Sequence, residues 1–472
     1  MKVLFVHSEE DNFSTEKPLE GLDRMQFGIS YISSLLKREG HETRLVVPTR
    51  ENDGIVDEHV RDFNPGLICF TSVYTEFAFL SGVAERVKKS HPEIFLLVGG
   101  PHASLNPDDC LKSSFDAVCI GEGEYPTLEL VEHLERGLSP TGIPNLHIKR
   151  GENIERNPTR PFLRDLEGLP FPDRDMWAPW VADPRSRPSV LVGRGCPFQC
   201  TYCCNHALGR LAEGRYVRLR SPQNIVDELI SIKSACPYLC EAYLEVETLG
   251  VNLEWALELC SLLERMNSEF EIAIEFGSNL RVTPNSDYEE LFAAFARSNF
   301  RFINIGLESG SERLRRDVLK RNYSNKDIIS AVQAAKEHGL EVGMYNLIGL
   351  PGETRKDFRE TIHVTRACQP DWFLLSVFFP YPGTELHDTC LELGLLDIPP
   401  DPGLERRKPA LNLPGFSKRQ VGRRYRWSPL LFYGGYRPLK EILWLVFLSK
   451  ISSSRRLLRY WRALSRKPYS CG

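Results

Sequence analysis

Three cysteines stand close together in the chain, at Cys196, Cys200 and Cys203. Cysteine thiolates bind iron–sulfur clusters, and three of them can hold three irons of a cubane while the fourth iron stays open to a ligand that is not protein. They are flanked by Pro197, Gln199, Thr201 and Asn205, which is unlike an apolar core. The spacing therefore predicts a four-iron four-sulfur cluster, with the adjacent Cys204 as a bystander.

A zinc site is the alternative that these cysteines leave open. Cys200 and Cys203 could begin a tetrahedral site completed by Cys236 and Cys240, and the chain would then be a zinc-binding module rather than an enzyme. Cys196 would be superfluous in that site, so we favour the cluster.

The cysteines follow the first of six predicted strands that alternate with helices. Six β/α units are too few for a complete eight-stranded barrel and predict a partial barrel over residues 189–395, with its working face at the C-terminal ends of the strands. The predicted strands are Ser189 to Val192, Ala242 to Val246, Glu271 to Phe276, Phe302 to Leu307, Val342 to Ile348 and Trp372 to Phe379.

Residues 1–138 also alternate short strands with helices, a pattern that predicts an α/β domain with a doubly wound parallel sheet. Such sheets bind ligands outside the carboxyl ends of their strands. Small turns at those ends would let a ligand approach the main chain, although simple tight turns have the same composition. The turn residues are Thr71, Ser72, Gly99, Gly100, His102, Gly121, Glu122 and Gly123. Residues 139–188 are rich in Pro, Gly and charge and are expected to form a linker.

The segment Gly195-Cys-Pro-Phe-Gln-Cys-Thr-Tyr-Cys203 resembles the signature of the radical S-adenosylmethionine (SAM) superfamily. Ile305-Gly-Leu-Glu308, Leu347-Ile-Gly-Leu-Pro-Gly-Glu-Thr354 and Phe379-Pro-Tyr-Pro-Gly-Thr384 are similar to later motifs of the same barrel. The resemblance implies a SAM site built from Tyr202, Glu247, Glu245, Ser278, Asn279, Arg281, Glu308 and Ser309. Glu247 is preferred to Glu245 for the methionine amino group, and strand alternation would put both on one face.

The chemistry implied by this resemblance begins with one electron passing from the reduced cluster into the sulfonium of SAM. The resulting 5′-deoxyadenosyl radical abstracts hydrogen from an unactivated C–H bond. A flavodoxin or ferredoxin is the expected electron donor.

A doubly wound domain before such a barrel resembles the cobalamin-binding members of the superfamily, and the turns around Gly99 and Gly121 are similar to theirs. This resemblance covers residues 1–395 and implies that a corrinoid lies over the strand ends. The Asp-x-His-x-x-Gly loop that supplies a lower cobalt ligand in many corrinoid proteins is absent. His102 could replace that ligand, but we expect it to be a structural turn residue.

The C-terminal region, residues 396–472, is basic, aromatic and predicted to be mostly helical. From Gly403 onward lie 17 of the 59 Lys and Arg residues but only two of the 63 acidic residues. Amphipathic helices, including one around Arg455 to Arg462, could anchor the chain at a membrane surface or pack on the barrel and cap its open side; we favour packing. No nucleic-acid-binding module accompanies the charge.

The N-terminal apolar run is too short for a signal peptide, and no stretch reaches the length of a membrane span, so we expect a cytoplasmic protein with peripheral membrane contact as an option. The predicted function is methyl transfer from methylcobalamin to a carbon or phosphorus centre of a small molecule or lipid. One alternative is cyclisation, oxidation or ring rearrangement with the same cofactors. Another is a methylthiotransferase, which would need three cysteine ligands for a second cluster in the N-terminal domain. Cys69, Cys110 and Cys119 lie in or beside apolar segments, which weakens that alternative.

Overall fold

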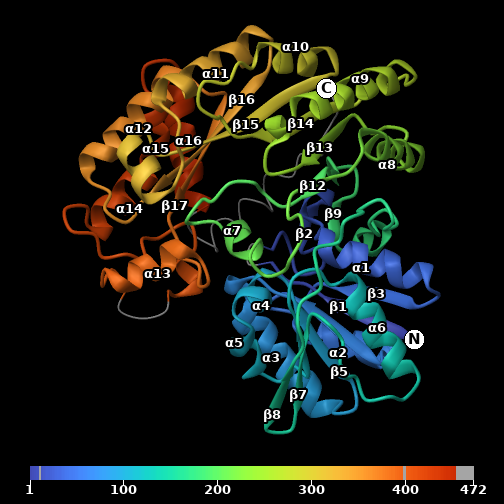
Figure 1. The fold of residues 1–472 in the computed structure, drawn as a ribbon. Coiled ribbons are helices and arrows are strands. Elements are labelled where there is room, and N and C mark those ends of the chain that lie inside the picture. The colour runs from blue at the N-terminus through green and yellow to red at the C-terminus, as the bar shows by residue number, and fades with distance from the viewer. Residues whose placement is uncertain (10–11, 397–399, 453–472) are drawn as a thin grey trace. The chain divides into compact units, whose positions relative to one another are not determined.

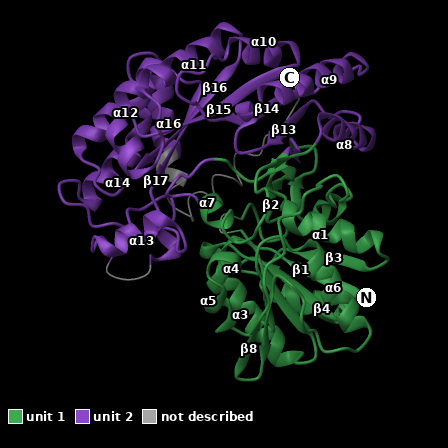
Figure 2. Ribbon diagram, in the orientation of Figure 1, with its two compact units in different colours: residues 1–186, 193–197, 204–220 green, residues 187–192, 198–203, 221–472 purple. Residues whose placement is uncertain are grey.

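The computed structural model describes residues 1–9, 12–396 and 400–452, and these residues form two compact units (Figures 1 and 2). The first unit contains residues 1–186, 193–197 and 204–220, and the second contains the remaining described residues. The basic segment around Arg455 to Arg462 lies outside the described residues.

A seven-stranded sheet forms the core of the first unit. Its strand order is β3-β1-β4-β5-β6-β7-β8, and the first five strands are parallel. The strands are β3 (Glu42–Val46), β1 (Lys2–Val6), β4 (Leu67–Thr71), β5 (Phe95–Gly99), β6 (Ala117–Cys119), β7 (Leu146–Arg150) and β8 (Asn153–Arg156). The helices are α1 (Phe27–Arg38), α2 (Ile55–Phe63), α3 (Tyr74–Ser90), α4 (Pro101–Leu105), α5 (Pro107–Leu111), α6 (Glu124–Glu135) and α7 (Cys204–Leu208). The doubly wound α/β prediction is confirmed.

Residues 139–186 are part of this unit and differ from the predicted linker. Strands β7 and β8 form an antiparallel hairpin that extends the sheet, and β9 (Val181–Asp183) pairs with β2 (Leu19–Gly21). Trp177 is fully buried, and its indole N–H donates to the Ser30 hydroxyl at 2.8 Å. The Pro- and Gly-rich composition of the segment gave no indication that Trp177 would be buried in this unit. A small antiparallel pair, β11 (Gly193–Arg194) with β12 (Arg218–Leu219), also belongs to this unit.

The second unit contains a six-stranded, wholly parallel sheet in the order β10-β13-β14-β15-β16-β17 (Figure 1). The strands are β10 (Ser189–Leu191), β13 (Glu241–Glu245), β14 (Glu275–Leu280), β15 (Phe300–Glu308), β16 (Glu341–Ile348) and β17 (Trp372–Val377). The intervening helices are α8 (Pro222–Ala235), α9 (Leu253–Ser268), α10 (Glu289–Arg297), α11 (Asn325–Glu337), α12 (Arg355–Cys368) and α13 (Glu385–Glu392). Sequential strands are neighbours, as the partial-barrel prediction requires.

Aromatic side chains and glycines alternate across one face of this sheet. A Cβ atom on Gly277 would lie 2.0 Å from the Phe302 ring, and one on Gly343 would lie 2.2 Å from Trp372 Nε1. The two glycines therefore make room for the rings on β15 and β17.

The described C-terminal region packs on the second unit as α14 (Lys418–Arg426), α15 (Ser428–Tyr433) and α16 (Leu439–Ser452). Phe432 and Tyr433 contact Phe373 of the edge strand β17, with ring centroids 4.7 and 4.9 Å apart. Packing on the barrel, the favoured prediction, therefore holds for these residues. No helix among the described residues is long and apolar enough to cross a membrane.

Candidate active site

The cysteine motif lies in the loop after β10. Cys200 is buried, and Cys196 and Cys203 are half-buried. Cys196 belongs to the first unit and the other two to the second. No three Cys, His, Asp or Glu side chains converge closely enough to hold a metal ion in the described part of the chain. The assignment of cluster ligands therefore rests on their spacing and donor chemistry.

The loop between Cys200 and Cys203 is tied to two neighbouring segments of the second unit. The Thr201 hydroxyl donates to the Val318 carbonyl at 2.6 Å, and the Leu386 amide donates to the Thr201 carbonyl at 2.9 Å. These partners come from the segment after β15 and from α13, which follows β17, so two segments of the second unit hold Thr201 in place.

Arg281 sits against Cys200. Its Nη1 atom donates to the Cys200 sulfur at 2.8 Å, and its guanidinium lies 3.6 Å from the centroid of the Phe198 ring. Its buried Nε has no hydrogen-bond partner among the described residues. Cysteine sulfurs ligate iron–sulfur clusters, and hydrogen bonds to those sulfurs tune the cluster, so this donor set fits a cluster.

A buried ion pair stands at the end of β15. Arg321 pairs with the Glu308 carboxylate, and its Nη1 donates to the Tyr202 hydroxyl at 2.9 Å. Burial raises the pKa of Tyr202 well above its ordinary value, and the Glu308 charge adds to this effect while Arg321 opposes it. Tyr202 is therefore held as a neutral hydroxyl.

Two features of the segment Ile305-Gly-Leu-Glu308 accompany this ion pair: the glycine at position 306 and the backbone conformation of Glu308. A Cβ atom on Gly306 would lie 2.5 Å from Glu308 Oε1 and 3.2 Å from the Arg321 guanidinium nitrogens. Glu308 itself has a φ of 61°, in the left-handed region that non-glycine residues rarely adopt. The ion pair thus requires a glycine beside it, and the positive φ of Glu308 is a conformation that is often found at functional sites.

Two serines predicted to face SAM are bonded within the protein. The Ser278 hydroxyl donates to the Leu244 carbonyl at 2.8 Å, and the Ser309 hydroxyl accepts from the Ser311 amide at 3.2 Å. Both serines are fully buried. Their role as SAM contacts stays a prediction, and their hydroxyls hold strands and loops together.

Asn279 belongs to a polar layer that adjoins the aromatic rings of the sheet. Its Oδ1 accepts from the Tyr243 hydroxyl at 2.7 Å, and that hydroxyl accepts from Asn304 Nδ2 at 3.2 Å. Trp372 Nε1 donates to Asn304 Oδ1 at 3.2 Å. The hydrogen bonds connect β13, β14, β15 and β17, a network that sequence reasoning missed apart from Asn279.

The two glutamates after Tyr243 occupy different positions. Strand β13 ends at Glu245, which is half-buried, and Glu247 lies beyond the strand and is exposed. Burial raises the pKa of Tyr345, and the charge of Glu245 contributes, which places Glu245 near Tyr345 on β16. Strand alternation does not extend to Glu247, and the choice between the two glutamates for the methionine amino group stays a prediction.

In the first unit, the predicted turns lie at the C-terminal ends of the neighbouring strands β4, β5 and β6. The Ser72 amide donates to the Gly99 carbonyl at 3.0 Å, following the last strand residue Thr71. Gly100 has a φ of 97°, and a Cβ atom there would lie 2.7 Å from the Ser72 carbonyl oxygen. Only glycine permits this close backbone approach at the ligand-binding edge of a parallel sheet.

Gly121 and Gly123 flank Glu122, whose carboxylate is already occupied. It accepts from Arg194 and Arg218, both at 2.9 Å, and from the Leu163 amide at 2.8 Å. Burial opposes ionisation, but the two arginines hold the pKa of Glu122 below its ordinary value. Arg194 stands two residues before Cys196, so Glu122 positions the start of the cysteine loop, a role that sequence reasoning did not foresee.

His102 lies on α4 and is buried between aromatic rings. Its ring centroid is 5.6 Å from that of Tyr74 and 4.5 Å from that of Phe77, and its Nε2 is 3.3 Å from the Asp109 carboxylate. Burial lowers its pKa. These contacts hold the His102 ring within the first unit, and its structural role stays a prediction.

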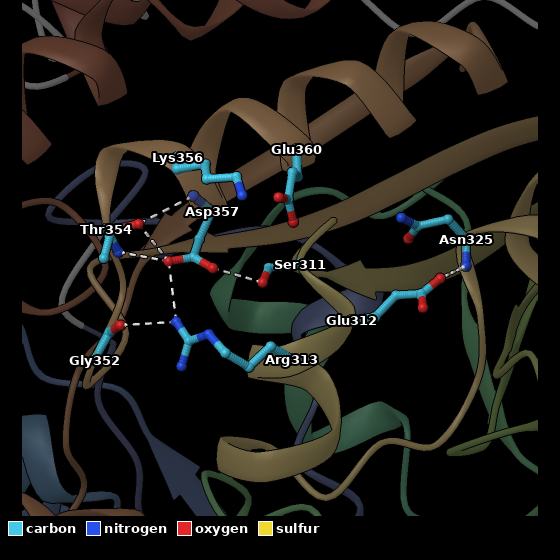
Figure 3. A pocket seen from close by; sticks show the side chains of 9 residues that line it. All are labelled: Ser311, Glu312, Arg313, Asn325, Gly352, Thr354, Lys356, Asp357 and Glu360. Atoms are coloured by element: carbon cyan, nitrogen blue, oxygen red, sulfur yellow. Dashed lines mark hydrogen bonds and ion pairs between the residues drawn. The ribbon is translucent and has the colours of Figure 1, made fainter.

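A surface cavity of about 680 Å³ lies beside the loop after β15 (Figure 3). Asp357, one of its lining residues, accepts from the Ser311 hydroxyl at 2.6 Å and from the Thr354 hydroxyl at 2.6 Å, and pairs with Arg313 at 3.0 Å. The bond between Thr354 and Asp357 is part of the capping box at the N-terminus of α12. The polar groups around Asp357 therefore satisfy one another and indicate a structural role.

Two family models match the chain. The model described as the radical SAM superfamily matches residues 190–364, and the model described as the B12 binding domain matches residues 21–131.

Known proteins match most of the chain. An uncharacterized methyltransferase of Pyrococcus horikoshii is 25% identical over 92% of each chain. An anaerobic magnesium-protoporphyrin IX monomethyl ester cyclase of Rubrivivax gelatinosus is 24% identical over 84% of this chain and 70% of its own. The cytidylyl-2-hydroxyethylphosphonate methyltransferase of Streptomyces wedmorensis is 23% identical over 82% of each.

Solved structures share the fold. The radical SAM methyltransferase TsrM of Kitasatospora setae, with tryptophan and a SAM analogue bound, has a TM-score of 0.65 at 18% identity over 84% of this chain and 78% of its own. The cobalamin-dependent radical enzyme OxsB has a TM-score of 0.70 at 15% identity over 99% of this chain and 73% of its own.

Proposed function

We propose that this chain is a cobalamin-dependent methyltransferase. It carries a B12-binding domain followed by a radical SAM domain, and is thus a radical SAM enzyme. It would transfer a methyl group from methylcobalamin to an unactivated carbon, or to a phosphorus centre, of a small molecule or lipid. The observation that carries the proposal is the order of the two domains, together with similarity over most of the chain to proteins named methyltransferases.

When bound, the cluster and SAM supply radical hydrogen abstraction, and the corrinoid supplies the methyl group. Cys196, Cys200 and Cys203 would hold the cluster. Arg281 donates a hydrogen bond to the Cys200 sulfur, and its Nε, which has no hydrogen-bond partner among the described residues, would donate to the carboxylate of SAM. Arg281 would thus place its positive charge between the cluster and the carboxylate of SAM and hold the two in position.

The polar layer described above would line the bottom of the site in which the reacting groups bind. It consists of Tyr243, Asn279, Asn304 and Trp372. Burial raises the pKa of the Tyr243 hydroxyl, and the nearby Glu245 charge adds to this effect, so the hydroxyl stays protonated. Because its donors and acceptors are neutral and hydrogen-bonded to one another, this layer would be rigid and would not exchange protons with the reacting groups. Glu245, at the end of β13, would receive the methionine amino group.

The second candidate keeps both cofactors but performs a cyclisation or oxidation without methyl transfer. The similarity to the magnesium-protoporphyrin cyclase over 84% of this chain favours it. In either case the chain needs a one-electron donor of the flavodoxin or ferredoxin class. Cytoplasmic location and peripheral membrane contact are further proposals that follow from the sequence.

The test is anaerobic incubation of the reconstituted chain with methyl-labelled SAM, hydroxocobalamin and a reductant, followed by assay for 5′-deoxyadenosine and S-adenosylhomocysteine. Methyl transfer predicts both products, and S-adenosylhomocysteine should depend on cobalamin. 5′-Deoxyadenosine alone, with cobalamin bound, would support the cyclase-type reaction instead. A Cys200→Ala variant should form neither product above the level without reductant.

A further inference from the structure

Four arginines line one groove on the second unit, formed where α14 and α15 pack beside α12. The groove has a volume of about 590 Å³ and includes Arg355 and Arg359 of α12 together with Arg423 and Arg424 of α14. Trp427 and, in α15, Leu430 and Leu431 also line it. We refer to it as the arginine groove.

None of the four arginines forms an ion pair with a carboxylate among the described residues. Other arginines in the same part of the unit are bonded: Arg366 donates to the Leu431 carbonyl at 2.7 Å, and Arg313 pairs with Asp357. The acid that acts on Arg424 is Glu353, which is buried and whose Oε2 accepts from two backbone amides. The groove therefore gathers four positive charges without local compensation.

Nothing in local helix energetics explains the two arginines of α12. Arg355 is the first residue of the helix, where the helix dipole disfavours a cation, and Arg359 follows four residues later on the same side. Like charges at this spacing destabilise a helix. Burial, together with the charges of the other three arginines, lowers the pKa of Arg424. An anion in the groove would relieve these repulsions.

We propose that the arginine groove binds a phosphate-bearing ligand. Guanidinium groups recognise phosphate oxygens in a bidentate manner, and arginines on two helices can engage more than one phosphate oxygen pair. The wall formed by Trp427, Leu430 and Leu431 is apolar, and Trp427 is 39% exposed, so the ligand would carry an apolar group next to its phosphate. Both a soluble phosphorylated metabolite and the headgroup of an anionic phospholipid have this chemistry.

The experiment uses the full-length chain and two probes. Pyrophosphate binding is measured by calorimetry at constant ionic strength, and binding to phosphatidylcholine vesicles containing phosphatidylglycerol is measured by co-sedimentation. The test variant is Arg359→Gln/Arg423→Gln. The matched control is Arg419→Gln/Arg426→Gln, which removes the same charge from exposed positions that do not line the groove.

The test variant should lose about tenfold or more in affinity for at least one probe, because each lost charge-assisted bond is strong, while the control stays close to the parent chain. Selective loss for pyrophosphate identifies a soluble ligand, and selective loss for vesicles alone identifies a lipid headgroup. Equal losses in both variants, or no binding of either probe, would overturn the proposal.

A second variant keeps the test valid if the first fails to fold. Arg359→Lys/Arg423→Lys retains both charges but loses the bidentate geometry, so its affinity should fall between those of the parent and the glutamine variant. Circular dichroism of each variant checks that the fold is intact. Affinity equal to that of the parent chain would show general charge attraction and contradict a built phosphate site.

Discussion

The Arg321→Met substitution should destabilise the second unit strongly. Arg321 is 5% exposed and Glu308 12% exposed, so the substitution leaves a nearly buried carboxylate without its partner. Removal of one member of a buried ion pair costs about 3 to 5 kcal/mol. Because Glu308 retains slight exposure, we expect about 3 kcal/mol, which corresponds to a fall of roughly 6 to 12 °C in the melting temperature of a domain of this size.

The assay is thermal unfolding of the chain under anaerobic conditions, combined with a double-mutant cycle. Glu308→Gln removes the stranded charge, so Arg321→Met/Glu308→Gln should recover a large part of the loss. Arg316→Met is the matched control, since Arg316 is 64% exposed and its pair with Asp317 lies at the surface. Additive losses in the cycle, or a fall no larger than that of the control, would refute the buried-pair reasoning.

Three further predictions concern the motif, a buried acid and the first unit. Alanine at any one of the three motif cysteines should abolish most iron and sulfide loading, whereas Cys204→Ala should not; equal loading in all variants would contradict the cluster. Burial raises the pKa of Glu353 from its ordinary 4.5 to about 8, so the folded state holds this proton more tightly than the unfolded chain and stability should fall as the pH rises through that interval. Glu353→Gln should flatten the unfolding profile between pH 5 and 8, and a slope as steep as that of the parent chain would contradict the assignment. Glu122→Gln should lower the melting temperature, because Arg194 and Arg218 lose a carboxylate that neutralises both, and an unchanged transition would argue against that role.

The sequence was most informative where chemistry depends on spacing along the chain. The order of strands and helices and the cysteine motif could be predicted because both are local patterns. The partners of those residues could not, because Arg281 and Arg321 approach Cys200 and Glu308 only through the fold. The resemblance points to Arg281 as a SAM residue but not to its bond with Cys200, and no local pattern points to Arg321.

Two expectations differ from the structure for identifiable physical reasons. The preference for Glu247 assumed that strand alternation continues, but β13 ends at Glu245. Residues 139–186 have the composition of a linker, yet Trp177 and the β7–β8 hairpin fix them to the first unit. The contacts of the buried Trp177 hold the segment in place despite its Pro and Gly content. These contacts are with residues far away in the sequence, so composition does not predict them.

The alternation of the chain between its two units has a consequence for engineering. Between Ser186 and Ser221 the backbone passes from one unit to the other five times. A cut at any bond inside this stretch would separate at least one unit from some of its own residues, so a single truncation cannot isolate either unit intact. Replacement of the first unit by that of a relative would likewise need several splice points.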